Sequence, residues 1–383
     1  MVRRRRRRRS NPAFWLLAAI VGALVIYVSI PVWRMQTADP GAIQLAGLSL
    51  GEILRERVLH SLTALWVFFF GACFGSFLNV VVHRLPAGES IAWNPSRCPY
   101  CRVPIRASDN IPVFAWLSLR GRCRACRLPI SSRYPIVEAT CGIGFLLFAA
   151  MVIAANGVNL PVGFGPPRPL SLVVLAPPWT LVVICLHHAA LLFALFGWAL
   201  MEYDDQKAPW TYAVWWLLFG LAVAVAAPFV TLIPWSEPSV LSYPADDYLR
   251  RLESPLAGAA LGLACGFCLT FWRPVHKSNS LVFAIVGVFL GWQATLSIGV
   301  LALLLSGIFQ PIRRARFLHS SAGVCLVAVG IHLTFWKYFA EVAWWPGSSP
   351  VATTGGCALL MCWMLTGALP RKRPEAGGLR PND

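Results

Sequence analysis

The stretch that decides the fold runs from Cys98 to Cys126 and holds two pairs, Cys98-Pro99-Tyr100-Cys101 and Cys123-Arg124-Ala125-Cys126, with 21 residues between them. Each Cys-x-x-Cys pair lets one tight turn direct two sulfurs at the same ion, and two pairs complete a tetrahedral four-sulfur site for a soft divalent metal. Such a closed site leaves no open coordination position, so its expected role is structural. The spacing therefore predicts a zinc site formed by Cys98, Cys101, Cys123 and Cys126.

The alternative interpretation of these cysteines is that they form disulfides or act as redox thiols. The segment between Arg97 and Arg133 is polar, arginine-rich and poor in long apolar runs, so it must fold with little core of its own. Metal binding supplies on the order of 10 kcal/mol in small metal-dependent modules. The charge pattern described below also predicts a reducing, cytoplasmic location, where disulfides are rare. Zinc is therefore the favoured interpretation.

The composition is that of an integral membrane protein. The chain has 383 residues, of which 57% are hydrophobic and only 13% are charged, whereas a soluble protein carries about a quarter charged residues. The net charge of +17 is compatible with a nucleic-acid-binding protein. However, the basic residues collect in the N-terminal run, the zinc loop and short connections on one side of the predicted spans, as the positive-inside rule requires. This distribution favours contact with anionic lipid headgroups, and no nucleic-acid partner is expected.

The hydropathy pattern predicts an all-α polytopic integral membrane protein with about eight to ten transmembrane helices and a small cytoplasmic zinc-binding loop domain. The run Arg3 to Arg9 precedes an apolar segment that is long enough to span the bilayer and lacks a clear cleavage site, so we expect an uncleaved first span and not a signal peptide. The segment 281–309 is too long for one untilted helix, and we expect a break near Gly291 that gives two short or re-entrant crossings. The expected spans are 13–33, 61–82, 135–155, 180–201, 210–233, 255–272, 281–309, 317–336 and 351–369.

This pattern divides the chain into four parts. Residues 1–60 form the basic N-terminus, the first span and an outer connection, and residues 61–138 hold the zinc loop. Residues 139–316 form a transmembrane domain, and residues 317–383 add further spans and a basic tail. Nine arginines between residues 84 and 133, against Glu89 and Asp109, favour a cytoplasmic zinc loop.

Several distinct motifs occur in order between about residues 71 and 138. They are Gly75-Ser-Phe-Leu-Asn79-Val-Val-Val-His83-Arg84-Leu-Pro86, the two cysteine pairs, Asp109-Asn110-Ile111-Pro112 and Arg133-Tyr-Pro-Ile-Val-Glu138. Together they resemble the N-terminal domain of type IV prepilin peptidases. The resemblance implies a polytopic helical membrane protein with a cytoplasmic zinc loop. It also implies an aspartic endopeptidase of the bacterial inner membrane, which cuts the leader from prepilins or pseudopilins in type IV pilus or type II secretion biogenesis, and which methylates the new N-terminus with S-adenosylmethionine.

The family's peptidase chemistry needs two carboxylates, one to take a proton from water and one to donate a proton to the amide. In the register of the first family motif, Glu202 stands where the family has its first aspartate, seven residues before Pro209, and Asp204 is a nearby substitute. In the register of the second motif, Asn279 replaces the other aspartate. An amide can hold water but cannot exchange a proton as a carboxylate does. The catalytic candidates are therefore Glu202, Asn279 and Asp204, in an impaired dyad.

Three functions follow from these observations. The first is a divergent prepilin leader peptidase and N-methyltransferase. The second is a non-catalytic membrane protein whose zinc loop docks pilin-like substrates or assembly partners. The third, a membrane-anchored nucleic-acid-binding zinc ribbon, has the required charge but lacks interleaved aromatic residues.

Overall fold

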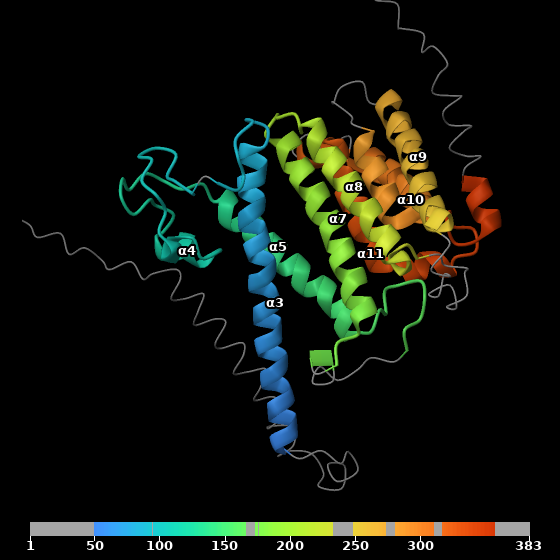
Figure 1. Ribbon diagram of the computed structural model, residues 1–383, viewed down its shortest axis with the longest axis horizontal. Helices are drawn as coiled ribbons and strands as arrows, with labels where there is room; N and C mark the ends of the chain where they lie inside the picture. The colour runs from blue at the N-terminus through green and yellow to red at the C-terminus, as the bar shows by residue number, and fades with distance from the viewer. Residues whose placement is uncertain are drawn as a thin grey trace, which may run out of the picture. The chain divides into compact units, whose positions relative to one another are not determined.

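The computed structural model describes residues 50–93, 95–165, 173–174, 176–232, 248–272, 280–309 and 316–356, and helices make up most of this part of the chain (Figure 1). Those residues contain two isolated β-bridges but no strand. The all-α fold class is therefore confirmed. The contacts divide the chain into two compact units. The first contains residues 1–158, 163–193 and 206–209, and the second contains residues 159–162, 194–205 and 210–383.

The first unit is built around two long antiparallel helices, α3 (Leu50–Arg84) and α5 (Arg133–Ala149), the second of which continues as a π-helical turn to Ala154. They pack closely because small residues lie at their interface. A Cβ atom on Gly75 would lie 2.7 Å from the Cα atom of Glu138, and one on Gly142 would meet the ring of Phe68 at the same distance. Small residues on both helices therefore permit this close packing.

Helix α3 begins at Leu50, so the prediction of a polar connection as far as His60 is wrong for residues 50–60. The charged residues of this segment extend the helix and do not end it. Glu52 lies in the first turn, where a carboxylate stabilises the helix dipole. Glu56 and His60 form an i,i+4 pair with an Oε1–Nε2 distance of 3.4 Å.

The second unit consists mainly of α8 (Trp210–Ala226), α9 (Tyr248–Trp272), α10 (Leu281–Phe309) and α11 (Ser321–Glu341). Short 3₁₀ turns occur at Pro228–Val230 and Arg316–His319. Helix α7 (Trp179–Tyr203) contributes its last residues to this unit and its first residues to the other.

The core of the second unit is the packing of α9 against α10. A Cβ atom on Gly258 would overlap the carbonyl oxygen of Gly287, and one on Gly262 would overlap that of Phe283. These helices approach so closely that only hydrogen fits at the contact positions. Along the pair, α9 residues from 254 to 266 meet α10 residues from 291 back to 280, so this part of α10 runs antiparallel to α9.

The expected break near Gly291 is confirmed. Gly291 has φ 80° and ψ 174°, a conformation open only to glycine. Beyond it, Gly299 lies against Cys265, whereas a continued antiparallel run would carry it past the start of α9. The chain therefore turns back at Gly291, and α10 is two helical segments that fold on each other.

By length and apolar composition, five described helical stretches qualify as membrane spans, namely α3 from Leu54, α5 with its π turn, α7, α11 and the two segments of α10 taken together. Helix α8 and the stretch Leu252–Phe267 of α9 are shorter apolar helices. The expected span 13–33 lies outside the described residues. Of the expected span 351–369, only the helical residues 350–356 are described.

Candidate metal centre and candidate catalytic residues

The four predicted zinc ligands lie together in the first unit. The sulfur atoms of Cys98, Cys101, Cys123 and Cys126 are all within 4.8 Å of one another, and all four cysteines are free thiols. The Cys98–Cys126 and Cys101–Cys123 sulfurs are 3.9 and 4.0 Å apart. A disulfide requires about 2.05 Å, whereas sulfurs about 2.3 Å from a tetrahedral zinc ion lie about 3.8 Å from each other. The cluster therefore has the donor set and spacing that fit a closed zinc site, and its geometry excludes a disulfide.

The cluster is formed by two turns of the same design, which we call the first knuckle (residues 97–105) and the second knuckle (residues 122–130). Both have the sequence Arg-Cys-x-x-Cys-Arg-Val/Leu-Pro-Ile. In each, the first cysteine's N–H donates to the carbonyl five residues later, at 3.1 and 2.9 Å. The residue after the second cysteine, Arg102 or Arg127, has positive φ of 56° or 61°. The same motif recurs 25 residues later in the sequence. The metal site was nevertheless predicted from the cysteine spacing alone.

Backbone N–H groups prepare the second knuckle for a metal. Those of Cys126 and Ala125 point at the sulfur of Cys123 and lower the pKa of its thiol to about 7. The thiolate is the form that binds a metal. These N–H groups therefore favour the thiolate at Cys123.

An ion pair joins the second knuckle to the 3₁₀ turn Ala107–Asp109. The Arg124 guanidinium donates to both oxygens of Asp109, from Nε at 2.7 Å and from a terminal nitrogen at 2.5 Å. The side chain of Asp109 is only 7% exposed. The hydrogen bonds from Arg124 lower the pKa of this carboxyl group below its usual value. This bidentate geometry makes the pair more specific than an ordinary surface salt bridge.

The zinc module, which we define as residues 85–132, is attached to the long helices by a buried carboxylate. Glu138 lies near the start of α5 and is 9% exposed. Its Oε2 accepts a hydrogen bond of 2.7 Å from the N–H of Val113, and the hydroxyl of Ser76 also reaches it. Nearby, the Asn79 amide donates to the carbonyl of Tyr134 at 3.3 Å. The family-like motif residues Ser76, Asn79 and Glu138 thus hold α3, α5 and the zinc module together.

The candidate catalytic residue Glu202 lies in the second unit, where it contacts the start of α11. Its Oε2 accepts from the N–H of Ala322 at 3.1 Å, and its Oε1 accepts from the Ser321 hydroxyl at 3.2 Å. The side chains of Ser320 and Trp198 are also within hydrogen-bonding reach of the carboxylate. A carboxylate at a helix N-terminus pairs with N–H groups that have no partner within the helix. Both oxygens of Glu202 are therefore occupied in a helix-capping contact.

The other two candidates are placed less fully. Asp204 follows the last turn of α7, where its N–H donates to the carbonyl of Leu200 at 3.1 Å. Asn279 lies outside the described residues. The catalytic roles of Glu202, Asp204 and Asn279 therefore stay predictions.

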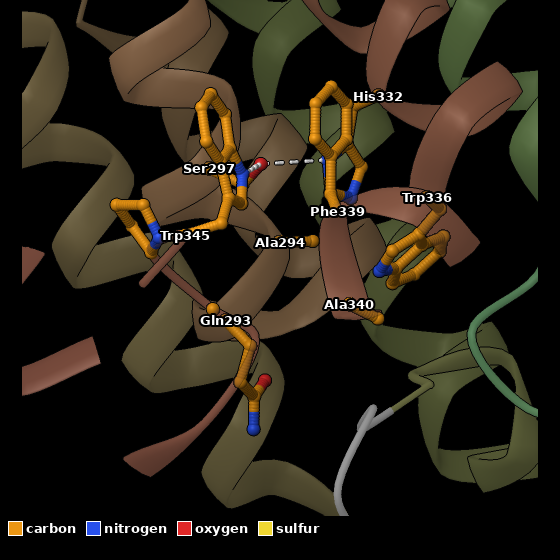
Figure 2. Close-up of a pocket in the computed structure, with 10 residues that line it drawn as sticks. Gln293, Ala294, Ser297, His332, Trp336, Phe339, Ala340 and Trp345 are labelled. Carbon is orange, nitrogen blue, oxygen red and sulfur yellow. Dashed lines mark hydrogen bonds between the residues drawn. The ribbon is translucent and has the colours of Figure 1, made fainter. Parts of the chain in front are cut away.

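A buried polar cluster in the second unit was not anticipated from the sequence. The Trp345 indole N–H donates to the hydroxyl of Ser297 at 2.7 Å, and this hydroxyl is 2.9 Å from Nδ1 of His332 (Figure 2). His332 is 1% exposed. The cluster lines a cavity of about 10 Å³ that Gln293 also borders, about the size of one water molecule. The available signal was a histidine within an apolar span, which marks a polar contact.

These features define the class of protein: a multi-pass helical membrane protein with a four-cysteine metal site in a loop between two spans. Residues 69–152 match the family model of the bacterial peptidase A24 N-terminal domain. The chain is 30% identical over 278 residues to a prepilin leader peptidase/N-methyltransferase of Myxococcus xanthus, and the alignment covers 65% of this chain and 66% of the relative. It is 39% identical over 142 residues to the enzyme of the same name from Aeromonas hydrophila, covering 31% of this chain and 44% of the relative.

A third relative is the type 4 prepilin-like proteins leader peptide-processing enzyme of Escherichia coli O78:H11, 43% identical over 110 residues, with 24% of this chain and 40% of the relative covered. No solved structure matches the chain at a comparable level. The chain thus aligns with less than two thirds of the length of these curated relatives. It is therefore similar to prepilin leader peptidase/N-methyltransferases over about two thirds of its own length, with the A24 N-terminal domain at residues 69–152.

Proposed function

We propose that this chain is a prepilin leader peptidase/N-methyltransferase homologue of the bacterial inner membrane that binds prepilin or pseudopilin leader peptides, and that its peptidase dyad is impaired. The similarity to leader peptidases over 65% of the chain supports the first part. The observation that carries the second part is the environment of Glu202. A general base must be aimed at the attacking water, whereas the start of α11 uses one acceptor site on each oxygen of this carboxylate and orients the carboxylate toward that helix end.

The substitution at the second motif supports the same proposal. Asn279 stands where the family has an acidic residue and cannot protonate the leaving amine. The absence of a positioned general acid typically lowers a rate by about 10² to 10⁴-fold. The expected peptidase activity is therefore absent or very low.

The zinc ion belongs to the proposed function as a structural cofactor. Cys98, Cys101, Cys123 and Cys126 would hold it, and its contribution is to order a loop that has little core. We further propose that the zinc module, the N-terminus and the C-terminal tail face the cytoplasm. The arginines of the module support this orientation. We propose no nucleic-acid partner.

The test is to incubate the purified full chain with a prepilin and S-adenosylmethionine and to follow leader removal and methylation by mass. The unaltered chain should cleave at least ~100-fold more slowly than an intact relative. The double substitution Glu202→Asp with Asn279→Asp should recover more activity than the sum of the single substitutions, because the two groups act as a unit. Rapid cleavage by the unaltered chain would contradict the impaired dyad.

A second candidate function is a non-catalytic protein that docks pilin-like substrates or assembly partners on the zinc module. The exposed arginines of the module favour an acidic partner. In the same assay, the double substitution would then restore no cleavage, although the prepilin would still bind. This outcome distinguishes docking from an impaired peptidase.

A further inference from the structure

The zinc module contains a run without charged residues that its metal site does not explain. The run extends from Ile111 to Leu119 between Asp109 and Arg120, and it includes the short helix α4 (Phe114–Ser118). Seven exposed arginines lie elsewhere in the module. The run is only partly covered by protein, since Ala115 is buried but Ile111 is 48% exposed. An uncharged, partly uncovered run in so basic a loop needs another apolar environment.

One contact places this run beside the membrane part of α3. The rings of Phe114 and Phe69 pack with their centroids 5.8 Å apart. Phe69 lies 15 residues before the end of α3 at Arg84, which is about 22 Å along the axis at 1.5 Å per residue. It also lies inside the charge-free run 61–82 of α3. Figure 1 accordingly shows α4 beside α3 and not beyond its end.

A second, independent contact gives a similar depth. Val113 donates its N–H to Glu138, which packs against Gly75 of α3. Gly75 lies nine residues before Arg84, about 13 Å along the axis. The run is therefore held between about 13 and 22 Å from the polar end of a helix that crosses the bilayer.

The backbone of the run is suited to an apolar medium. The N–H groups of Ala115, Leu117 and Leu119 donate to carbonyls four residues earlier, at 2.9, 3.2 and 2.9 Å. The Ser118 hydroxyl donates to the carbonyl of Ala115 at 3.0 Å. Non-helical chain at membrane depth is tolerated only where its polar groups have such partners, and the Glu138 carboxylate provides one for Val113.

We propose that residues 111–119 enter the bilayer alongside α3 and α5, and that the exposed arginines beside them bind the phosphates of anionic lipids. Arg106, Arg120 and Arg122 flank the run and are exposed. Within the module only Glu89 and Asp109 are acidic, and Asp109 is bound to Arg124. The zinc module is thus a membrane-binding surface with an apolar wedge, whether or not the chain cleaves prepilins.

The test is photo-crosslinking of the full chain in nanodiscs of phosphatidylethanolamine and phosphatidylglycerol. Benzoylphenylalanine replaces Ile111, and a lipid adduct is measured by intact mass. The positive control replaces Trp66, which is 65% exposed on α3, and the matched control replaces Leu128, which is 43% exposed in the second knuckle. The Ile111 adduct yield should approach that at Trp66 and exceed that at Leu128 by at least ~fivefold, because only the wedge reaches acyl chains.

Zinc content is measured for each variant, so that only folded protein is compared. No lipid adduct at Ile111, with a normal adduct at Trp66, would overturn the insertion, as would an adduct to another protein at Ile111. Replacing phosphatidylglycerol by phosphatidylcholine, or making Arg120→Gln with Arg122→Gln, should lower the yield at Ile111 at least ~twofold. A yield unchanged by both would overturn the binding of anionic headgroups.

Discussion

Truncation of Glu202 should destabilise the second unit even though no substrate is involved. The structure makes this carboxylate a cap for α11, since it accepts hydrogen bonds from Ala322 and Ser321 at 3.1 and 3.2 Å. Glu202→Ala removes both acceptors and leaves the N–H of Ala322, a fully buried residue, without its partner. Aspartate, the residue of the family motif, would not replace Glu202 as a cap for α11, because Glu202→Asp withdraws the carboxylate by one methylene.

The expected cost follows from these two bonds. A hydrogen bond to a charged group contributes about 1.5–3 kcal/mol, and partial exposure lets water replace some of this. A loss of about 2–4 kcal/mol is therefore expected for Glu202→Ala, and about half of that for Glu202→Asp. In a body of about 150–250 residues, 1 kcal/mol shifts Tm by about 2–4 °C. The Tm should thus fall by about 4–16 °C for alanine and about 2–8 °C for aspartate.

The assay is thermal unfolding of the detergent-solubilised full chain. Glu341→Ala is the matched control, because Glu341 is an exposed glutamate at the opposite end of α11, and it should change Tm by less than about 1 °C. If Glu202→Ala leaves Tm equally unchanged, the capping contact does not stabilise the protein. The hydrogen bonds from Ser321 and Ala322 would then not hold the Glu202 carboxylate in place, contrary to the proposed reason for the impaired dyad.

Three further predictions concern the zinc module and the helix core. Cys123→Ser should lower the zinc content from about one per chain to less than ~0.2 and make residues 85–132 protease-sensitive while the spans stay inserted; a full zinc complement would refute the four-sulfur site. Asp109→Asn should remove the bidentate pair with Arg124 and speed zinc loss to a chelator at least ~twofold, as measured with a zinc dye, and an unchanged rate would show that the pair does not hold the second knuckle. Gly258→Val should abolish folding of the second unit by forcing α9 away from Gly287, whereas a normal elution profile and Tm would contradict the close packing.

The sequence by itself determined the features that depend on local spacing. The two cysteine pairs predicted four sulfurs at one point, because each Cys-x-x-Cys turn fixes its two ligands locally. Apolar length predicted the spans, since a bilayer sets the number of residues needed to cross it. The break at Gly291 was predicted because the apolar run was too long for one crossing. The start of α3 was missed because charged residues resemble a loop, although helical pairing continues through them.

Only the tertiary structure decided what each carboxylate contacts. The register of the family motif gave Glu202 a catalytic position. In the fold, the start of α11, which lies more than 100 residues later in the chain, surrounds its carboxylate with hydrogen-bond donors. Likewise, the sequence shows Glu138 only as part of a motif. The fold adds the hydrogen bond that its carboxylate accepts from the N–H of Val113, 25 residues away. The depth of α4 also follows from the contact between Phe69 and Phe114, and not from composition. These contacts join residues far apart in the chain, so no local pattern encodes them, and hydrogen-bond geometry in the folded chain decides what each group can do.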